Sequence, residues 1–350
     1  CLLVATWSLP SVSAWVPSSR PQNLQPPVMT RGNSNAASRS ALFGVARRAA
    51  NLFRGGGRER TRDELKLGIA GFYDRSSKLW EDVWGEHMHH GFYVPENRTD
   101  HVQAQVDLID QVLAWAKVDS CTKAVDVGCG IGGSSRHLAR KYNCQTEGIT
   151  LSPYQAGRGN ELAEEQGLKG KCNFQVADAL QMPFQDNSFD VVWSLESGEH
   201  MPDKVQFVSE LFRVCEPGGR IIIVTWTHRD LDEGESLTKK EDKLLDKINR
   251  AYYLPRWCSG KDYVNLLEGF GAKDVQREDW SYIIAPFWKA VIRSSLNLKS
   301  IWGLLRSGFS TIRGAYAMLL MLRGYKNGLI KFDLLTCTKP PAVSKHGMPM

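Results

Sequence analysis

Length, composition and charge exclude several classes of protein at once. The chain has 350 residues, 42% hydrophobic and 23% charged, so we expect a packed globular core and not wholesale disorder. The longest apolar run in its body is residues 315–322, far short of the roughly 18 residues that cross a bilayer, so we expect no membrane-spanning helix. The eight cysteines include no Cys-x-x-Cys pair and no nearby His at ligand spacing, which favours reduced thiols over a disulfide framework or a zinc site.

Charge is distributed unevenly along the chain. Residues 1–62 contain nine Arg and one acid, and residues 280–350 contain ten Lys or Arg against Asp333 alone. The body between them, residues 63–279, is therefore acidic although the whole chain carries a formal net charge of +6. A protein that binds nucleic acid needs a basic face on its main fold, so we expect no nucleic-acid partner.

The first 62 residues are typical of a targeting presequence. Residues 2–14 form a short apolar stretch that ends in Val-Ser-Ala, as at a signal-peptide cleavage site, and residues 31–62 are rich in Arg, Ser, Ala and Asn, as in a transit peptide. With Trp15 after the cleavage site, the two parts resemble the plastid presequences of algae with secondary plastids, which implies import into a plastid. An ordinary disordered N-terminus is the alternative. In both cases we expect residues 1–62 to be disordered and outside the fold.

The middle of the chain alternates strand and helix signals. We expect strands at residues 123–127, 144–149, 173–176, 189–193 and 220–226, and helices at residues 132–142, 153–167 and 203–215. Such alternation predicts an α/β fold in which helices cover both faces of a mostly parallel sheet.

A glycine-rich turn follows the first expected strand. The sequence VDVGCGIGG at residues 125–133 places Gly128, Gly130 and Gly132 where the strand turns into a helix, so that the backbone can approach a ligand closely. The spacing differs from the G-x-G-x-x-G of dinucleotide sites, and Asp126 precedes the first glycine. An acid there suits a cationic amino-acid group and opposes a pyrophosphate, which favours S-adenosylmethionine over NAD. A merely structural turn is the alternative.

Three later motifs strengthen this interpretation. VADA at residues 176–179 puts Asp178 after the third strand, where it could accept from an adenine amino group; a fourth strand and EPGGR at residues 216–220 follow at the usual intervals. Together they resemble the class I S-adenosylmethionine-dependent methyltransferases, which implies a Rossmann-like, seven-stranded sheet. The resemblance implies donor contacts from Asp126, Gly128, Cys129, Gly130, Gly132, Gly133, Thr150, Leu151, Gln155, Asp178, Ala179 and Glu196. One departure is that Glu147 lies too early on the second strand to hold the ribose, so Thr150, Leu151 and Gln155 are the candidates for that contact.

Histidines and aromatic residues crowd the segment before the glycine turn. FYD at residues 72–74 and LWEDVWGEHMHHGFY at residues 79–93 bring three His together, but His87, His89 and His90 lack helix-face spacing and a nearby thiol or carboxylate pair, so we expect no metal. A lid that packs on the core, with incidental His, is the alternative to an acceptor site. If the segment binds an acceptor, we expect contacts from Tyr73, Trp80, Trp84, His87, His89, His90, Tyr93, Trp257, Phe287 and Trp288.

These segments, with SLESGEHMPDK at residues 194–204, YLPRWC at 253–258 and APFW at 285–288, closely resemble the plant and algal γ-tocopherol methyltransferases over residues 64–338. The resemblance implies C-methylation of a lipophilic chromanol ring, γ- to α-tocopherol and δ- to β-tocopherol, in vitamin E biosynthesis. An indole-type N-methyltransferase shares the flanking motifs and is the main alternative; a sterol or lipid methyltransferase and a non-catalytic lipid carrier are further ones. We expect a methyltransferase domain at residues 63–340, with an acceptor-side lid (63–122), a donor-binding core (123–226), an acceptor-binding cover (227–340) and a tail (341–350).

Methylation of a phenol ring carbon needs a base near the hydroxyl group. His200 is the first candidate, because its unperturbed pKa lies near neutrality, and Glu196 is the second; both, with Glu199, follow the fourth strand at the end where α/β sheets bind ligands. The alternative is that Glu199 and His200 only brace this loop or cap the next helix.

The C-terminal region carries a basic stripe. Lys299, Arg306 and Arg313 recur every seven residues beside apolar positions, which predicts an amphipathic helix that contacts anionic plastid membrane, at the envelope or another surface. A cover helix over the site is the alternative.

Overall fold

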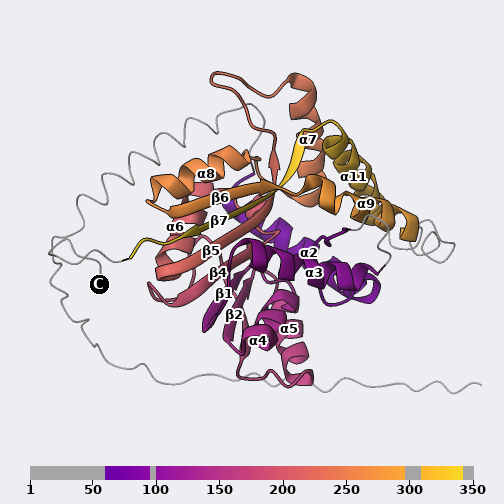
Figure 1. Ribbon diagram of the computed structural model, residues 1–350. Coiled ribbons are helices and arrows are strands. Elements are labelled where there is room, and N and C mark those ends of the chain that lie inside the picture. Colours follow the sequence, from indigo (N-terminus) through magenta and orange to yellow (C-terminus); the bar gives the residue numbers. More distant parts are fainter. Residues whose placement is uncertain (1–59, 95–99, 296–308, 342–350) are drawn as a thin grey trace, which may run out of the picture. The chain divides into compact units, whose positions relative to one another are not determined.

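The computed structural model describes residues 60–94, 100–295 and 309–341, which belong to one compact unit (Figure 1). The predicted presequence and tail therefore lie outside the described residues, apart from residues 60–62 and 341. Two residues before the predicted start of the domain at residue 63 already contact the fold. Arg60 donates to the backbone oxygen of Asn249 at 3.0 Å, and Thr61 caps the first helix. Thr61 accepts from the backbone N–H of Glu64, whose carboxylate accepts in return from the backbone N–H of Thr61.

Helices and strands alternate through the middle of the chain, as predicted. In chain order the described elements are α2 (Arg62–Trp84), α3 (His101–Trp115), β1 (Lys123–Val127), α4 (Gly133–Tyr142), β2 (Gln145–Thr150), α5 (Pro153–Glu165), β3 (Cys172–Val176), β4 (Phe189–Leu195), the 3-10 turn η1 (Gly198–His200), α6 (Lys204–Val214), β5 (Cys215–His228), α7 (Lys239–Tyr252), α8 (Gly260–Gly269), β6 (Lys273–Asp279), α9 (Ser281–Ser295), α11 (Phe309–Lys326) and β7 (Ile330–Thr338).

The largest difference from the predicted elements is the start of β5, which begins at Cys215 and not at residue 220. Cys215 pairs with Phe189 of β4, and the register shifts before Val191 pairs with Arg220. The sequence Pro-Gly-Gly at residues 217–219 lies within this irregularity, so the strand absorbs residues that normally interrupt a sheet.

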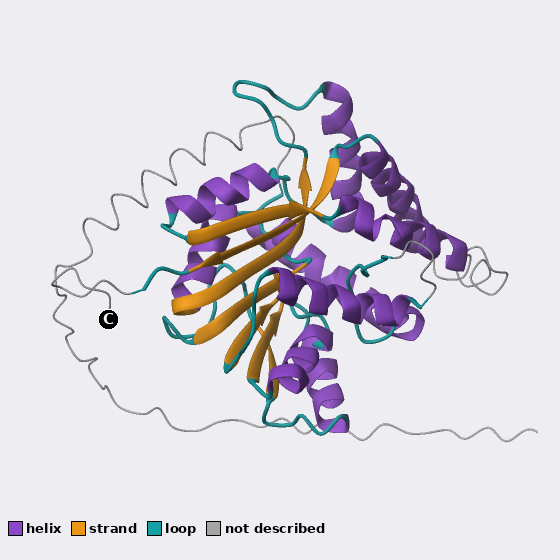
Figure 2. Ribbon diagram, viewed as in Figure 1, coloured by secondary structure: helices purple, strands orange, loops and turns teal. Residues whose placement is uncertain are grey.

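The seven strands form one sheet in the order β3-β2-β1-β4-β5-β7-β6 (Figure 2). β7 runs antiparallel to its neighbours β5 and β6, and the other neighbouring strands of the sheet are parallel. This confirms the predicted mostly parallel sheet. The middle of the sheet places Asp126 of β1 beside Gly148 of β2 and Trp193 of β4, so the loops after these strands meet at the same edge.

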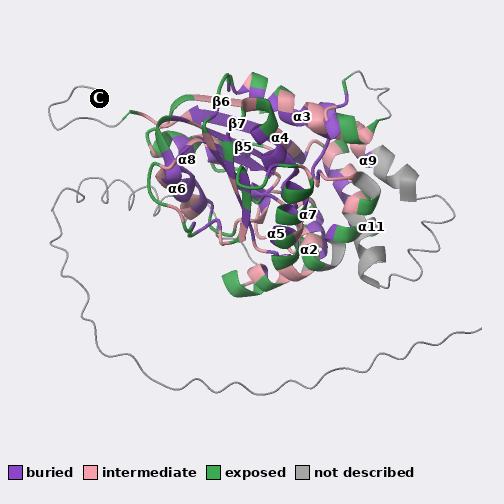
Figure 3. Ribbon diagram, turned by 90° about the horizontal axis from the view of Figure 1, so that it is seen from below, coloured by how far each residue is buried: buried purple, intermediate pink, exposed green. Residues whose placement is uncertain are grey.

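Helices cover both faces of the sheet, because its side chains alternate between two cores. Val125 and Val127 pack with Phe207 of α6 and Leu267 of α8, whereas Ala124 lies in the core on the opposite face. That second core is filled by α3, α4 and the first turn of α9. Figure 3 shows β5 and β7 buried between these layers.

The helices α7, α9 and α11 gather near one end of the sheet (Figure 1). They share a core that includes Leu245 and Ile248 of α7, Trp288 of α9 and Met321 of α11. None of the described helices is long and apolar enough to cross a membrane. The seven described cysteines are buried and free, with no disulfide among the described residues.

Candidate active site

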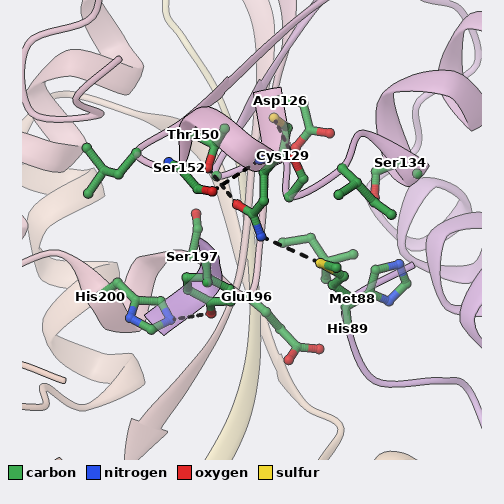
Figure 4. A pocket seen from close by; sticks show the side chains of 18 of the residues that line it. Met88, His89, Asp126, Cys129, Ser134, Thr150, Ser152, Glu196, Ser197 and His200 are labelled. Atoms are coloured by element: carbon green, nitrogen blue, oxygen red, sulfur yellow. Dashed lines mark hydrogen bonds between the residues drawn. The ribbon is translucent and has the colours of Figure 1, made fainter. Parts of the chain in front are cut away.

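The loops after β1, β2 and β4 border a hollow that we call the glycine-loop cleft, with about 800 Å³ of empty space that includes its open mouth. Helix α2 supplies the opposite wall with Ile69, Ala70 and Tyr73. Figure 4 shows Asp126 and Cys129 toward one end of the cleft and Glu196 and His200 toward the other. Of the predicted donor-binding residues, those that line it are Asp126, Gly128, Cys129, Gly130, Gly133, Thr150, Leu151, Gln155 and Glu196.

Two glycines explain how the backbone can border the cleft directly. Gly128 and Gly130 have φ values of 84° and 55°, in the left-handed region that favours glycine. A Cβ on Gly128 would lie 2.3 Å from the Cβ of Ser197, so this glycine is required for the packing of β1 against the loop after β4. A Cβ on Gly130 would enter the cleft, with Met88 Sδ 3.6 Å away as its nearest neighbour. The cleft therefore has room for a ligand against the bare backbone of Gly130.

Asp126 is a buried carboxyl group at the base of this loop. Only 2% of it is exposed, and its Oδ2 accepts from Ser135 Oγ at 2.6 Å. Burial raises the pKa of Asp126 to about 6, although the hydrogen bonds from Ser135 oppose the shift. The group is thus mostly a carboxylate at neutral pH, and it lines the cleft where a cationic amino group would satisfy it.

The tip of β2 supplies polar groups in place of a carboxylate. Thr150 Oγ1 donates to Gln155 Oε1 at 2.7 Å, and Gln155 Nε2 donates to Ser77 Oγ of α2 at 3.1 Å. Glu147 is turned away, because its Oε2 accepts from the side chain of Asn173 at 2.9 Å. Thr150 and Gln155 therefore line the cleft, whereas the side chain of Glu147 contacts β3.

Asp178 lies in a neighbouring hollow of about 470 Å³ that shares Gly128, Thr150 and Leu151 with the cleft. Ala179 lines the same hollow. The Asp178 carboxylate contacts both Arg62 and Lys66 of α2 at 2.5 Å. Burial would raise its pKa, but these two cations and the N–H of Leu180 hold it below the usual range. The sequence did not indicate that α2 supplies partners for this acid.

A third hollow, which we call the aromatic cavity, has about 850 Å³ of empty space including its opening. Its apolar walls come from Trp226 of β5, Tyr252 of α7, Phe287 and Trp288 of α9, and Met318 of α11. Six residues line both the cleft and the aromatic cavity and form what we call the shared wall: Tyr73, His87, Met88, His89, Glu196 and His200. A group held in the cleft and a ring held in the cavity can therefore meet across this wall.

Two carboxyl groups of the site have opposite protonation states. Glu196, with φ of 53°, accepts from the backbone N–H of His90 at 2.6 Å and lies 2.8 Å from His90 Nδ1. Burial would raise the pKa of Glu196, but its interactions with His90, the two hydrogen bonds included, hold it below the usual range. Glu199 accepts from Thr225 Oγ1 at 2.7 Å; burial and the charge of Glu196 raise its pKa to about 8. Glu196 is thus a carboxylate and Glu199 mostly a neutral acid at pH 7.

The histidines of the shared wall are neutral. Burial, with the nearby Lys204, lowers the pKa of His200 to about 4, and its Nε2 lies 3.0 Å from the hydroxyl of Tyr73. Burial likewise lowers the pKa of His87 to about 2 and that of His89 below its usual value. Among the described residues no group of three His, Cys, Asp or Glu side chains is placed to hold a metal ion.

The structure brings most of the predicted acceptor-side residues together. Tyr73, His87, His89, His90, Phe287 and Trp288 line the aromatic cavity with all three candidates for the base. Tyr93 instead contacts His101 at 2.9 Å, and Trp257 donates to Asn249 at 2.6 Å, so neither lines the cavity. The side chains of Trp80 and Trp84 lie outside the described residues.

Sequence reasoning missed several lining residues, namely Met88, Gln105, Trp226, Tyr252 and Met318. They come from five separate segments and carry no common motif. Gln105 is nonetheless structural: its side chain donates to the backbone oxygens of His87 and His89 at 2.8 and 2.9 Å and fixes the shared wall.

Comparison with known proteins assigns the family. A profile described as a methyltransferase domain matches residues 125–223. A probable tocopherol O-methyltransferase, chloroplastic, of Oryza sativa subsp. japonica is 59% identical over 285 residues, which are 79% of this chain and 79% of the relative. The tocopherol O-methyltransferase, chloroplastic, of Arabidopsis thaliana is 54% identical over 290 residues, 79% of this chain and 83% of the relative. The chain belongs to the tocopherol O-methyltransferase family.

Its fold agrees with that of a solved geranyl diphosphate methyltransferase in complex with GPP and sinefungin, with a TM-score of 0.64 at 21% identity over 79% of this chain and 99% of that one. The protein is an S-adenosylmethionine-dependent methyltransferase. The cleft fits this donor, because Asp126 offers a carboxylate to its ammonium group and Gly130 leaves room beside the backbone. Of the other residues predicted to bind the donor, Thr150, Leu151 and Gln155 line the same cleft, and Asp178 and Ala179 line the neighbouring hollow.

Proposed function

We propose that this chain methylates the chromanol ring of tocopherols, converting γ- to α-tocopherol and δ- to β-tocopherol in vitamin E biosynthesis. The observation that carries the proposal is the shared wall, which borders both the glycine-loop cleft and a cavity lined by Trp226, Phe287 and Trp288. A flat, largely apolar ring suits these aromatic surfaces. The names of the two plant relatives support tocopherol as the acceptor class.

The chemistry requires an activated ring carbon at the shared wall. A phenol is a poor carbon nucleophile, whereas its phenolate carries charge to the ortho carbon. Bound S-adenosylmethionine supplies an electrophilic methyl group. The chain's own residues orient the ring, which can supply much of the rate enhancement. His200 Nδ1 is buried and has no partner, and we propose that it binds the acceptor's hydroxyl group. Its low pKa makes this neutral ring a weak acceptor of a full proton.

We further propose that the enzyme works in the plastid, at a membrane surface from which it takes its acceptor. The chloroplastic names of both relatives support the plastid. Met318 of α11 lines the aromatic cavity, while Tyr316 and Leu319 of the same helix are 50% and 53% exposed. Helix α11 thus lines the aromatic cavity with one residue and exposes two apolar side chains to solvent. The basic stripe predicted for contact with anionic lipid lies outside the described residues, including the side chain of Arg313.

A labelled methyl donor tests the proposal. The protein is incubated with the donor and, separately, γ-tocopherol, δ-tocopherol, a sterol and an indole amine, and the labelled products are identified. We expect label on the chromanol ring carbon of both tocopherols. Transfer to the indole nitrogen alone would favour the N-methyltransferase alternative and refute the proposal. Binding of donor and tocopherol without transfer to any of the four would favour a lipid carrier.

A further inference from the structure

The aromatic cavity contains an imidazole that is held differently from the others. His90 is 2% exposed, and its ring centroid lies 4.4 Å from that of Phe287 and 5.0 Å from that of Trp288. Its Nδ1 lies 2.8 Å from Glu196 Oε2, and its Nε2 is buried without a hydrogen-bond partner. The ring lines the aromatic cavity and not the glycine-loop cleft.

The partner of Nδ1 fixes where the proton of the neutral ring lies. A carboxylate only accepts hydrogen bonds, so Nδ1 of His90 must donate to Glu196, and the lone pair of the neutral ring is on Nε2. The second oxygen of Glu196 accepts from the backbone N–H of His90 at 2.6 Å, which prevents the carboxylate from turning away. A carboxylate that holds an imidazole by Nδ1 and stabilises the imidazolium is the arrangement that makes histidine a general base in catalytic triads.

We propose that His90 is the general base that takes the phenolic proton of the acceptor, and that Glu196 is its positioning residue. This assignment rests on the proposed function, since only a phenolic acceptor has that proton. The ring carbon that receives the methyl group must reach the shared wall, and the hydroxyl group is on the neighbouring ring carbon. His90 lines the aromatic cavity beside that wall, because its Nδ1 contacts Glu196, which is part of the wall.

The proposed reaction consists of a proton transfer to His90, the methyl transfer and the return of the ring to an aromatic phenol. The phenolic O–H proton passes to Nε2 of His90 while the oxygen's electron pair is delocalised to the ortho carbon. That carbon forms a bond to the methyl carbon as the methyl–sulfur bond breaks, with its electron pair left on sulfur. The ring carbon then releases its hydrogen as a proton to water, and the imidazolium returns its proton to the oxygen, which restores the aromatic phenol.

The other titratable groups of the cavity are poorly suited to this step. His89 Nδ1 donates to the backbone oxygen of His90 at 2.7 Å, and burial lowers the pKa of His89 although the nearby Glu196 opposes the shift. His200 is held against the hydroxyl of Tyr73. Burial raises the pKa values of Tyr73 and Tyr252, which keeps both phenols protonated. The remaining titratable groups that line the cavity are His87, whose pKa is strongly lowered, and Glu199, whose pKa is raised.

The test compares His90→Asn with His200→Asn and His89→Asn in the full chain. The amide nitrogen of Asn can replace Nδ1 as the donor to Glu196, but Asn has no counterpart of Nε2. We expect His90→Asn to lower kcat for γ-tocopherol at pH 7 by at least about 100-fold, the usual scale for a lost general base. The dissociation constant for S-adenosylhomocysteine should stay within about threefold of that of the wild type, which also shows that the variant is folded.

The pH profile separates loss of a base from loss of packing. Between pH 7.5 and 9, hydroxide ionises more of the bound acceptor without help from an imidazole, so the ratio of His90→Asn to wild-type kcat should rise about tenfold per pH unit. Titration of Glu199 occurs in both proteins and cancels in the ratio. For His200→Asn and His89→Asn the corresponding ratios should not change with pH. Glu196→Gln should behave like His90→Asn, and Glu196→Asp should recover part of the rate.

Two results would overturn the assignment of His90. One is a wild-type kcat for His90→Asn at pH 7, and the other is a lowered kcat whose ratio to the wild type does not vary with pH. If His90→Asn does not bind the donor product, His90→Gln and Glu196→Gln are measured by the same criteria. The proposed function is tested by the wild type alone. If the wild type methylates no tocopherol, the proposed function is refuted, whatever the variants do.

Discussion

At the scale of single residues, burial decides which groups of the site carry charge. Asp126 and Glu199 are both buried carboxyl groups with raised pKa values, about 6 and about 8, whereas Glu196 beside His90 remains ionised. A shift of one pKa unit corresponds to about 1.4 kcal/mol of difference between the two protonation states. The local environments of Asp126, Glu196 and Glu199 therefore give these three acids different charges near neutral pH. Asp126 is the group whose titration lies closest to the physiological range on the acid side.

The raised pKa of Asp126 predicts a pH-dependent donor affinity. Below pH 6 the folded protein holds this group as a neutral acid, which attracts the donor's ammonium group less, so affinity should fall as the pH decreases through 6, by up to about tenfold per unit. Asp126→Asn should bind more weakly and without this dependence. Calorimetric titration with S-adenosylhomocysteine from pH 5 to 7.5 measures both. An equal pH dependence in the variant would show that another group controls binding.

The same carboxyl group also affects the stability of the protein without donor. The pKa of about 6 in the folded protein lies above the ordinary value of 3.8 for an Asp side chain, so ionisation opposes folding. This cost is absent below pH 4, grows as the pH rises toward 6 and is constant above that. Asp126→Asn removes the titration, so its melting temperature relative to the wild type should increase between pH 4 and 6.

Gly130 and Gly128 should respond differently to the same substitution. Gly130→Ala places a methyl group in the cleft, and with a φ of 55° it should cost about 1–2 kcal/mol of stability while it lowers donor affinity at least about tenfold. Gly128→Ala would bring its Cβ to 2.3 Å from that of Ser197, so it should prevent stable folding. Thermal unfolding and calorimetry distinguish the two results; wild-type donor affinity in Gly130→Ala would contradict the assignment of the cleft.

At the scale of elements, α2 is tied to the donor-binding half of the fold along its length. Besides the contact with Asp178, Asp74 of α2 accepts from Ser152 Oγ at 2.5 Å. Arg158 of α5 forms a bidentate ion pair with Glu81 of α2, in which it donates to both carboxylate oxygens at 2.9–3.3 Å. Tyr73 of α2 is also part of the shared wall. The packing of α2 against α5 therefore links donor binding to the geometry of the acceptor side.

The pair of Glu81 and Arg158 predicts a test of this linkage. Their side chains are 19% and 24% exposed, so Glu81→Gln should cost only about 1 kcal/mol of stability in urea unfolding. We expect KM for the donor to rise severalfold, since α2 forms one wall of the cleft. Asp82→Asn is the matched control, because Asp82 lies on the same helix and contacts only the exposed Lys78, at 3.8 Å. An equal rise in KM in both variants would exclude a specific role of the Glu81 pair.

At the scale of the whole molecule, the acceptor cavity is completed by elements far apart in the sequence. The His-rich segment after α2, the end of β5 and the helices α7, α9 and α11 all contribute to its lining. The outer side of α11 exposes Tyr316 and Leu319, and we place the proposed membrane contact there.

The basic stripe gives this contact a measurable prediction. If Lys299, Arg306 and Arg313 face anionic lipid, each should add about 1 kcal/mol of attraction, so changing all three to Gln should weaken vesicle binding by up to about a hundredfold. Wild-type binding should weaken as salt rises, because exposed charges are screened. Activity on detergent-dispersed acceptor should survive.

Flotation on anionic liposomes at two salt concentrations measures this binding. The matched control changes the exposed Lys117, which precedes β1, and Lys169 and Lys171, which precede the edge strand β3, and it alters the net charge equally. Equal binding by the stripe variant and the wild type would end the membrane proposal and favour a cover helix.

Local sequence by itself predicted the strands β1 to β5 and the glycine-rich turn after β1, whereas β6 and β7 were not located by it. Apolar strands that alternate with helical segments leave few ways to bury both faces, and the Gly-rich turn with Asp126 follows one strand directly, so both could be predicted before any tertiary contact was known. Predicted strand ends agree with the structure except in β5, where pairing with β4 extends the strand through Pro217 and Gly218.

Only the tertiary structure decided the acceptor side and the protonation states. Trp226, Tyr252 and Met318 join one cavity from segments without a common motif, because their proximity depends on how β5, α7 and α11 pack. His90 and Glu196 are separated by 106 residues, and nothing in either local sequence indicates their hydrogen bond. The pKa of a buried group depends on desolvation and on neighbouring charges, and both are properties of the folded environment that residue type and spacing do not contain.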